Sequence, residues 1–171
     1  MQILQIGRLS NDVNAHLERE YGACALWQQT QIDEFLQQHG ANFELVVTSA
    51  AYGLTAAHMA MLPNLRAVCS FGVGYDSIDV AALQQNSIVL SNTPDVLTDC
   101  VADLAMGLLI DVSRGISAGD RYARAGLWGS KQRMGMGVRV TGKKLGILGL
   151  GRIGLAIAER AQGFKMNIGY H

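Results

Sequence analysis

Short apolar runs alternate with segments of helical period over the first ninety residues. The runs with the length and composition of buried strands are residues 3–6, 24–27, 45–47, 66–69 and 88–90. The segments with apolar positions at helical spacing are residues 11–20, 31–39, 55–62 and 78–85. Strands that alternate with helices predict an α/β fold, a parallel sheet covered on both faces. The alternative, a mixed α+β domain, lacks an Asn-Gly or Asp-Gly hairpin signal.

The pattern changes at Thr98. From there to about residue 125 the helical spacing continues without a breaker, which predicts one helix about 40 Å long. Such a helix suits a link between two domains, with Thr98 as its N-cap and Asp99 at the positive end of its dipole. The glycine-rich stretch that follows has no period. We therefore expect three parts: residues 1–97, a helix and linker at 98–141, and a second domain that begins at 142–171.

A glycine motif separates a strand-like run, residues 144–148, from a helix-like run, residues 155–162. In a dinucleotide-binding turn Gly149 makes the tight bend, Gly151 admits the pyrophosphate, and Gly154 lets helix and strand pack closely. The amides of Arg152 and Ile153 would then point at the phosphates. The alternative is a structural turn without a ligand, but the strand before it and the helix after it favour the cofactor.

His171 stands at the tip of the next predicted strand, residues 166–170. An acidic residue about 20 positions after the glycines usually binds the ribose 2′-hydroxyl of NAD(H). A histidine cannot replace that carboxylate, and it tolerates a 2′-phosphate better. The position favours NADP(H) and leaves NAD(H) open, since His171 could also be a polar strand end.

A second glycine-containing loop, residues 70–76, follows the predicted strand at 66–69. Gly72 and Gly74 would expose backbone amides that suit an anion such as a carboxylate. The spacing fits equally well a tight β–α turn with Asp76 as a helix cap. From the residues by themselves both interpretations stay open.

Composition excludes several classes of function. Fourteen basic residues balance fourteen acidic ones, so the chain lacks the basic field typical of nucleic-acid binding. No window reaches the roughly 18 apolar residues of a membrane helix. The three cysteines, Cys24, Cys69 and Cys100, suggest neither a disulfide framework nor a metal site. We expect a cytoplasmic protein without nucleic-acid or membrane partners.

Four segments, in this order along the chain, resemble the D-isomer-specific 2-hydroxyacid dehydrogenase family. They are residues 71–79 (FGVGYDSID), 92–105 (NTPDVLTDCVADLA), 120–128 (DRYARAGLW) and 142–154 (GKKLGILGLGRIG). Within the family the chain is most similar to the NADPH-preferring glyoxylate/hydroxypyruvate reductases, including the hydroxyphenylpyruvate reductases. The resemblance implies a flavodoxin-like substrate domain, a long linking helix and the first βαβ unit of a Rossmann domain.

The resemblance also assigns roles. It implies that the amides of Val73 and Gly74 hold the carboxylate of a small 2-oxoacid substrate. It implies that Thr98 lies near the cofactor and that Arg152 and Ile153 contact its pyrophosphate. A homodimer formed through the cofactor domains is expected, and Trp128 in the linker fits an interface.

The family's catalytic arginine, glutamate and histidine match no position up to His171. We therefore expect these 171 residues to be part of a longer chain and to be inactive by themselves. The whole protein is expected to reduce a 2-oxoacid with NAD(P)H. The alternative within the same fold is a non-catalytic NAD(H)-sensing interaction protein.

Overall fold

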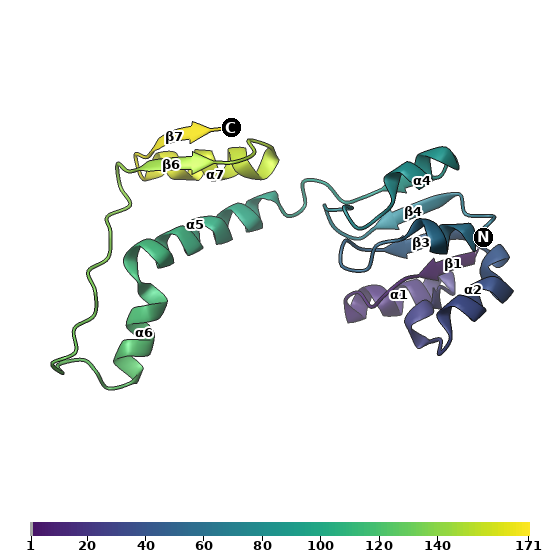
Figure 1. Ribbon diagram of the computed structural model, residues 1–171, viewed down its shortest axis with the longest axis horizontal. Coiled ribbons are helices and arrows are strands. Elements are labelled where there is room, and N and C mark those ends of the chain that lie inside the picture. Colours follow the sequence, from purple (N-terminus) through teal and green to yellow (C-terminus); the bar gives the residue numbers. More distant parts are fainter. Residues whose placement is uncertain (1) are drawn as a thin grey trace. The chain divides into compact units, whose positions relative to one another are not determined.

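The computed structural model describes residues 2–171, which form two compact units divided between Pro94 and Asp95. The first unit holds a five-stranded parallel sheet in the order β2-β1-β3-β4-β5 (Figure 1). Its strands are β1 (Gln2–Gln5), β2 (Cys24–Ala25), β3 (Phe43–Thr48), β4 (Ala67–Ser70) and β5 (Val89–Ser91). Its helices are α1 (Asn11–Tyr21), α2 (Ile32–His39), α3 (Ala56–Ala60) and α4 (Val80–Gln85), with 3-10 turns η1 (Leu26–Gln28) and η2 (Gly40–Asn42). The predicted α/β fold is confirmed.

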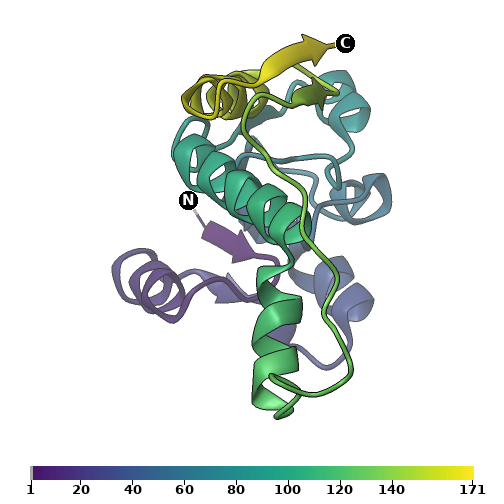
Figure 2. The ribbon, with the colours of Figure 1, turned by 90° about the vertical axis from the view of Figure 1, so that its left-hand side faces the viewer.

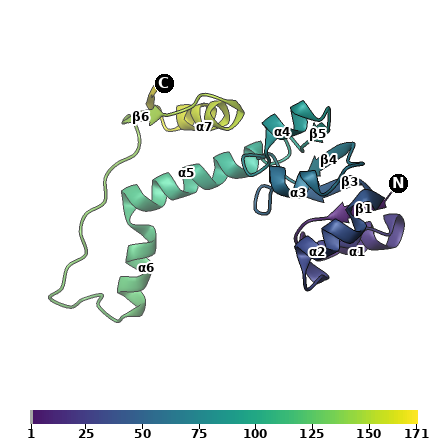
Figure 3. The same ribbon diagram turned by 45° about the vertical axis from the view of Figure 1, so that its right-hand side comes forward.

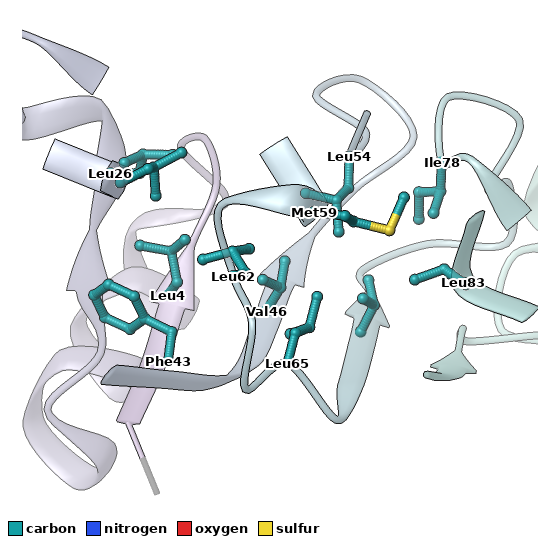
Figure 4. Close-up of a cluster of buried hydrophobic side chains, with 12 residues drawn as sticks. Leu4, Leu26, Phe43, Val46, Leu54, Met59, Leu62, Leu65, Ile78 and Leu83 are labelled. Carbon is teal, nitrogen blue, oxygen red and sulfur yellow. The ribbon is translucent and has the colours of Figure 1, made fainter. Parts of the chain in front are cut away.

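The strand order determines which helix covers which face. Right-handed crossovers place α1 on one face and α2, α3 and α4 on the other. Toward one side of the sheet α1 and α2 lie by β1, and at the other side α4 lies by β5 (Figure 3). The main core forms under α2–α4, where Leu4, Val46 and Val68 of three adjacent strands are fully buried (Figure 4).

The opposite face of the sheet is only partly covered by the described residues. Val13 and Leu17 of α1 lie at one side of an apolar hollow of about 420 Å³, and Leu45 and Cys69 of the sheet also line it. Helices therefore lie on both faces, as expected, and the described residues cover the face on the side of α1 only in part.

The predicted strand at 24–27 is too long. β2 ends at Ala25 because the chain turns into η1, and this turn buries Leu26. The other strands and helices of the first unit match their predicted ranges within a few residues. In the apolar run 24–27 the first two residues form a strand and the last two belong to a turn, and hydrophobic periodicity does not distinguish these two structures.

The second unit contains three helices and a two-stranded parallel sheet. Its elements are α5 (Thr98–Arg114), α6 (Ile116–Arg124), β6 (Lys144–Ile147), α7 (Arg152–Gly163) and β7 (Asn167–Tyr170). Small buried side chains lie where α5 and α7 pack together, among them Ala102 and Ala161. The small sheet leaves apolar surface open, since Leu148 is 88% exposed and Tyr170 is 69% exposed.

The predicted continuous helix from Thr98 to residue 125 is wrong. Gly115 adopts a left-handed conformation (φ +65°), which ends α5, and α6 starts in a new direction. Asp111 stabilises the bend, because its carboxylate accepts hydrogen bonds from the amide (2.6 Å) and the hydroxyl (2.7 Å) of Ser117.

The linker after α6 has no helix or strand, as predicted. It runs back along α6 to the end of α5 (Figure 2), where Val138 N donates to Ser113 O at 2.6 Å. Tyr122 Oη donates to Gln132 O at 2.6 Å and holds the middle of the linker against α6.

Candidate substrate and cofactor sites

The loop after β4 presents Val73 and Gly74 at the carboxyl edge of the first sheet. In open α/β sheets this edge is where ligands bind. Among the described residues, nothing accepts a hydrogen bond from the amide of Val73 or of Gly74. Two adjacent free N–H groups can donate to the two oxygens of one carboxylate.

Side chains around this loop bind its carbonyl groups. Ser70 Oγ donates to Gly74 O at 3.2 Å, and Asn92 Nδ2 donates to Val73 O at 2.8 Å. Thr93 binds both polar groups of the Gly72 backbone, at 2.9 and 3.1 Å. These contacts hold the loop from the carbonyl side and leave the amides of Val73 and Gly74 available.

The helix after this loop is not capped by Asp76. Asp79 is the N-cap of α4, and its Oδ1 accepts a hydrogen bond from Ala82 N at 2.9 Å. The interpretation of residues 70–76 as a turn capped by Asp76 is therefore wrong. The loop is longer than that interpretation requires, which leaves the free amides without a structural role in the described chain.

The glycine turn of the second unit has the geometry expected of its first and third glycines. Gly149 has φ +89°, a conformation that other residues rarely adopt, and Gly149 N donates to His171 O at 2.9 Å. A Cβ on Gly154 would lie 2.3 Å from Gly149 O, so only glycine lets α7 approach the turn this closely. The turn and the tip of β7 are thus adjacent, and His171 lies beside Gly149.

Gly151 is different, because no contact within the chain requires a glycine there. A Cβ at this position would meet nothing within 4 Å, and its φ is −81°. In the part of the chain that the structure describes, the amides of Arg152, Ile153 and Gly154 have no hydrogen-bond acceptor. Open space above a glycine, beside free amides at a helix N-terminus, fits a pyrophosphate.

Helices α5 and α7 run parallel, so both N-termini lie at the same end. Three ion pairs show this parallel arrangement. Arg152 Nε lies 2.8 Å from Asp95 Oδ1. Arg160 Nε lies 2.6 Å from Asp103 Oδ1, and Arg160 Nη2 lies 2.9 Å from Asp99 Oδ1. Asp95, which precedes α5, and Asp103 are eight residues apart, as are their partners Arg152 and Arg160 on α7. The two positive dipole ends therefore point toward the same region, which favours an anionic ligand there.

Thr98 is the first residue of α5 and not its N-cap, contrary to the prediction. Leu97 occupies the cap position, and no side chain bonds to the free amides there. The Asp95–Arg152 pair holds the segment before Thr98 near the N-terminus of α7. Thr98 is therefore at the end of α5 where the glycine turn lies.

The neutral net charge conceals an uneven distribution. Residues 1–94 carry three basic and eight acidic side chains, whereas residues 95–171 carry eleven basic and six acidic ones. The unit with the glycine turn is therefore positively charged, which attracts an anionic cofactor.

Other kinds of site find little support in residues 2–171. No group of histidine, cysteine, aspartate or glutamate side chains in this range could hold a metal ion, and its three cysteines are free. Burial raises the pKa of the thiols of Cys24 and Cys69, which makes both poor nucleophiles. In the same range no helix is long and apolar enough to span a membrane.

Sequence reasoning missed the residues that support these sites. Ser70, Asn92 and Asp95 lie within the segments that it singled out, but hydropathy gives no signal for a side chain that binds a neighbouring carbonyl or arginine. One clue was available: Asn92 and Asp95 are small polar residues two and five positions after the predicted strand at 88–90.

Residues 3–164 match the sequence profile of the D-isomer-specific 2-hydroxyacid dehydrogenase catalytic domain. The chain is 38% identical over 169 residues to a glyoxylate/hydroxypyruvate reductase A of Arabidopsis thaliana, covering 99% of this chain and 54% of the relative. It is also 38% identical over 171 residues to a hydroxyphenylpyruvate reductase of Plectranthus scutellarioides, covering 98% and 53%. The chain spans about half the length of these relatives.

Solved structures show the same similarity. A 2-hydroxyacid dehydrogenase from Ketogulonicigenium vulgare matches with a TM-score of 0.89 and 36% identity, over 99% of this chain and 53% of that one. An NADPH-dependent glyoxylate/hydroxypyruvate reductase from Sinorhizobium meliloti, in complex with NADP and malonate, matches with a TM-score of 0.83 and 32% identity. That match covers 99% of this chain and 52% of the other.

Proposed function

The chain belongs to the D-isomer-specific 2-hydroxyacid dehydrogenase family, and on this premise we propose that the protein reduces a small 2-oxoacid with NAD(P)H. The substrate class is that of glyoxylate and hydroxypyruvate, which the names of several relatives carry, and the product is the D-2-hydroxyacid. One observation carries the proposal. Each unit presents adjacent amides without an acceptor in the described chain, at Val73–Gly74 and at Arg152–Ile153.

The first unit binds and orients the substrate in this proposal. The amides of Val73 and Gly74 donate to the substrate carboxylate, and Asn92 and Ser70 hold their carbonyls away from it. Because the loop is already held in place, little conformational entropy is lost when the anion binds. This fixes the carboxylate and thereby the position of the neighbouring keto carbon.

The second unit binds the cofactor. Gly149, Gly151 and Gly154 shape the turn, Arg152 and Ile153 donate to the pyrophosphate, and Thr98 lies at the same end of the unit. NAD(P)H supplies the hydride that reduces the keto carbon. The proton donor and the substrate-orienting arginine of the family match no residue up to His171, so we assign no catalytic residue to this chain.

NADP(H) is the favoured cofactor, with NAD(H) as the alternative. His171 lies beside Gly149, where an aspartate would repel a 2′-phosphate, and the surrounding unit carries an excess of basic side chains. The Sinorhizobium relative, which is described as NADPH-dependent, supports this preference.

Further assignments rest on the same family. We propose residues 1–97 as the flavodoxin-like substrate domain, 98–141 as the linking helices and loop, and 142–171 as the start of the cofactor domain. A cytoplasmic homodimer is proposed. An exposed apolar stripe on α5, formed by Leu104, Leu108 and Val112, supports an interface between copies.

Substrate binding can be tested on the 171 residues with oxamate, a 2-oxoacid mimic that is not reduced. Calorimetry should detect oxamate binding to the wild type, and Asn92→Ala should weaken it because Val73 O loses its donor. Asn86→Ala is the matched control, since Asn86 bonds only within α4 and its turn. Equal oxamate affinity of the wild type and Asn92→Ala would contradict the proposal that the Val73–Gly74 loop binds the substrate carboxylate.

Turnover is a separate measurement. NADPH absorbance is followed with glyoxylate or hydroxypyruvate. We expect the 171 residues to bind ligands without consuming NADPH, because no residue in them is assigned as the proton donor. NADPH consumption above a protein-free blank would show that residues 1–171 contain a proton donor.

A further inference from the structure

A polar cavity of about 570 Å³ lies at the carboxyl ends of β1 and β2, apart from the Val73–Gly74 loop. Its volume falls within the roughly 300–1,000 Å³ typical of small-molecule sites. The walls come from the loop after β1, one face of α1, β2 and η1. Neither the Val73–Gly74 loop nor the glycine turn at residues 149–154 contributes a lining residue.

Gln5 is the buried polar group of this cavity. Gln5 is only 2% exposed. Its Nε2 donates hydrogen bonds to Gly7 O at 3.2 Å and to Asn14 Oδ1 at 2.7 Å. Asn14 Oδ1 also accepts from Leu9 N at 3.0 Å, so it must be an acceptor toward Gln5. This network fixes the orientation of the Gln5 amide.

The remaining atom of that amide, Gln5 Oε1, receives no hydrogen bond from any described residue. Every fully buried side-chain oxygen or nitrogen of the described chain has a hydrogen-bond partner. Since Gln5 Oε1 has none, this oxygen is not fully buried. An acceptor held in a fixed orientation on a buried side chain, and open to a cavity, suits a ligand that donates a hydrogen bond.

Two charges of opposite sign also line the cavity. Neither the guanidinium of Arg8 nor the carboxylate of Glu18 forms an ion pair with any residue that the structure describes. They lie more than 4.0 Å apart, since they are not paired with each other. The other ionisable wall residue, Cys24, has a thiol whose pKa is raised by burial and which stays neutral. A ligand with both a negative and a positive end would satisfy both charges.

We propose that this cavity binds a free α-amino acid with a polar side chain. The ammonium group donates to Gln5 Oε1 and pairs with Glu18, and the carboxylate pairs with Arg8. Trp27, Gln28 and Gln29 also line the cavity, so an aromatic ring and two side-chain amides are available to the ligand. The site is independent of the proposed reductase activity.

Nuclear magnetic resonance can test the proposal on the 171 residues with L-glutamine as the probe. The chain has two tryptophans, so the indole N–H of Trp27 reports on the cavity and that of Trp128 is an internal control. L-Glutamine should shift the Trp27 indole and the Gln5 side-chain amide in a saturable way and leave Trp128 unchanged.

Two analogues of L-glutamine test the contributions of its ammonium and carboxylate groups separately. Glutaramate lacks the ammonium group and 4-aminobutanamide lacks the carboxylate, so each should bind about tenfold more weakly than L-glutamine. Arg8→Gln and Glu18→Gln should each weaken L-glutamine binding by a similar factor. Both side chains are exposed, so the fold should tolerate these changes.

Matched controls are Arg19→Gln on α1 and Glu34→Gln on α2, neither of which lines the cavity. They should leave the affinity unchanged. The proposal is overturned if L-glutamine gives no saturable shift, if either analogue binds as well as L-glutamine, or if Arg8→Gln and Glu18→Gln leave its affinity intact.

Discussion

The glycines of this chain are needed for different physical reasons. The contacts that a Cβ would make at each position distinguish these reasons. Gly154 is required by steric contact with Gly149 O, whereas Gly151 has open space and an ordinary φ. Gly7 combines both constraints, with φ +79° and a Cβ position 2.2 Å from the ring of Tyr52. Because Gly151 also lies beside free amides at the N-terminus of α7, it is the glycine that points to a ligand.

Gly7→Ala should destabilise the protein more than Gly22→Ala. Both positions have positive φ, but a Cβ on Gly22 meets nothing within 4 Å. Gly22→Ala should therefore cost only the left-handed conformation, about 1–2 kcal/mol, and Gly7→Ala should add the displacement of Tyr52. Urea unfolding of both variants measures the difference. Equal losses would show that the Tyr52 contact contributes nothing.

The tight turn at Gly149, the close packing at Gly154 and the position of the 70–76 loop after β4 could be predicted from sequence because each depends on local spacing. The contacts of Asn92 with Val73 and of Asp95 with Arg152 could not, since each joins segments 19 or more residues apart. Asp79 was missed as a cap because Asp76 and Asp79 are equally good capping residues, and only the length of the loop decides between them.

At the scale of elements, the junction between α5 and α6 departs most from the predicted pattern. The apolar positions keep a helical spacing across Gly115, so periodicity predicts one helix where there are two. Gly107 has the same residue type inside α5 and does not end it. The difference lies in Asp111, whose carboxylate binds Ser117 and stabilises the new direction after Gly115.

The Asp111 contact should make stability depend on pH. Hydrogen bonds from the amide and then the hydroxyl of Ser117 hold the pKa of the Asp111 carboxyl below its ordinary value of 3.8. A lowered folded-state pKa stabilises the fold above the ordinary pKa, and this contribution disappears as the pH falls through the folded pKa. Asp111→Asn should therefore be less stable than the wild type at neutral pH, and the difference should shrink in acid.

Urea unfolding at about pH 7 and about pH 2.5 tests this expectation. Asp76→Asn is the control, because it removes the same charge from an exposed side chain that bonds to no described residue. A difference between the wild type and Asp111→Asn that is the same at both pH values would contradict the assigned role.

At the scale of the whole molecule, the folding of either unit does not explain two surface features, a charge excess and exposed apolar side chains. The basic charge of residues 95–171 suits an anionic cofactor. Val112 at 84%, Trp128 at 84% and Met136 at 98% exposure leave much apolar surface on α5 and the linker. Periodicity predicted the apolar positions of α5 but could not show which of them face α7.

If the α5 stripe joins two copies, Leu108→Glu combined with Val112→Glu should produce a monomer near 18.4 kDa. Two buried charges without partners would oppose association, while the exposed positions let each copy keep its fold. Light scattering after size-exclusion chromatography measures the mass. Val89→Glu, at a position 64% exposed in the first unit, should leave the dimer intact. A wild type that is already monomeric would contradict the proposed interface.

The central claim is that the turn from Gly149 to Gly154 holds a dinucleotide, and one binding measurement tests it most directly. Calorimetric titration with 2′-phospho-ADP-ribose compares the wild type, Gly151→Ala, and the control Gly163→Ala at the far end of α7. A Cβ meets nothing within 4 Å at either glycine, so both variants should unfold at the wild-type temperature. We predict binding by the wild type and the control, and about tenfold or greater loss in Gly151→Ala. Equal affinity in all three proteins would contradict the claim, and no binding by the wild type would contradict it for NADP(H).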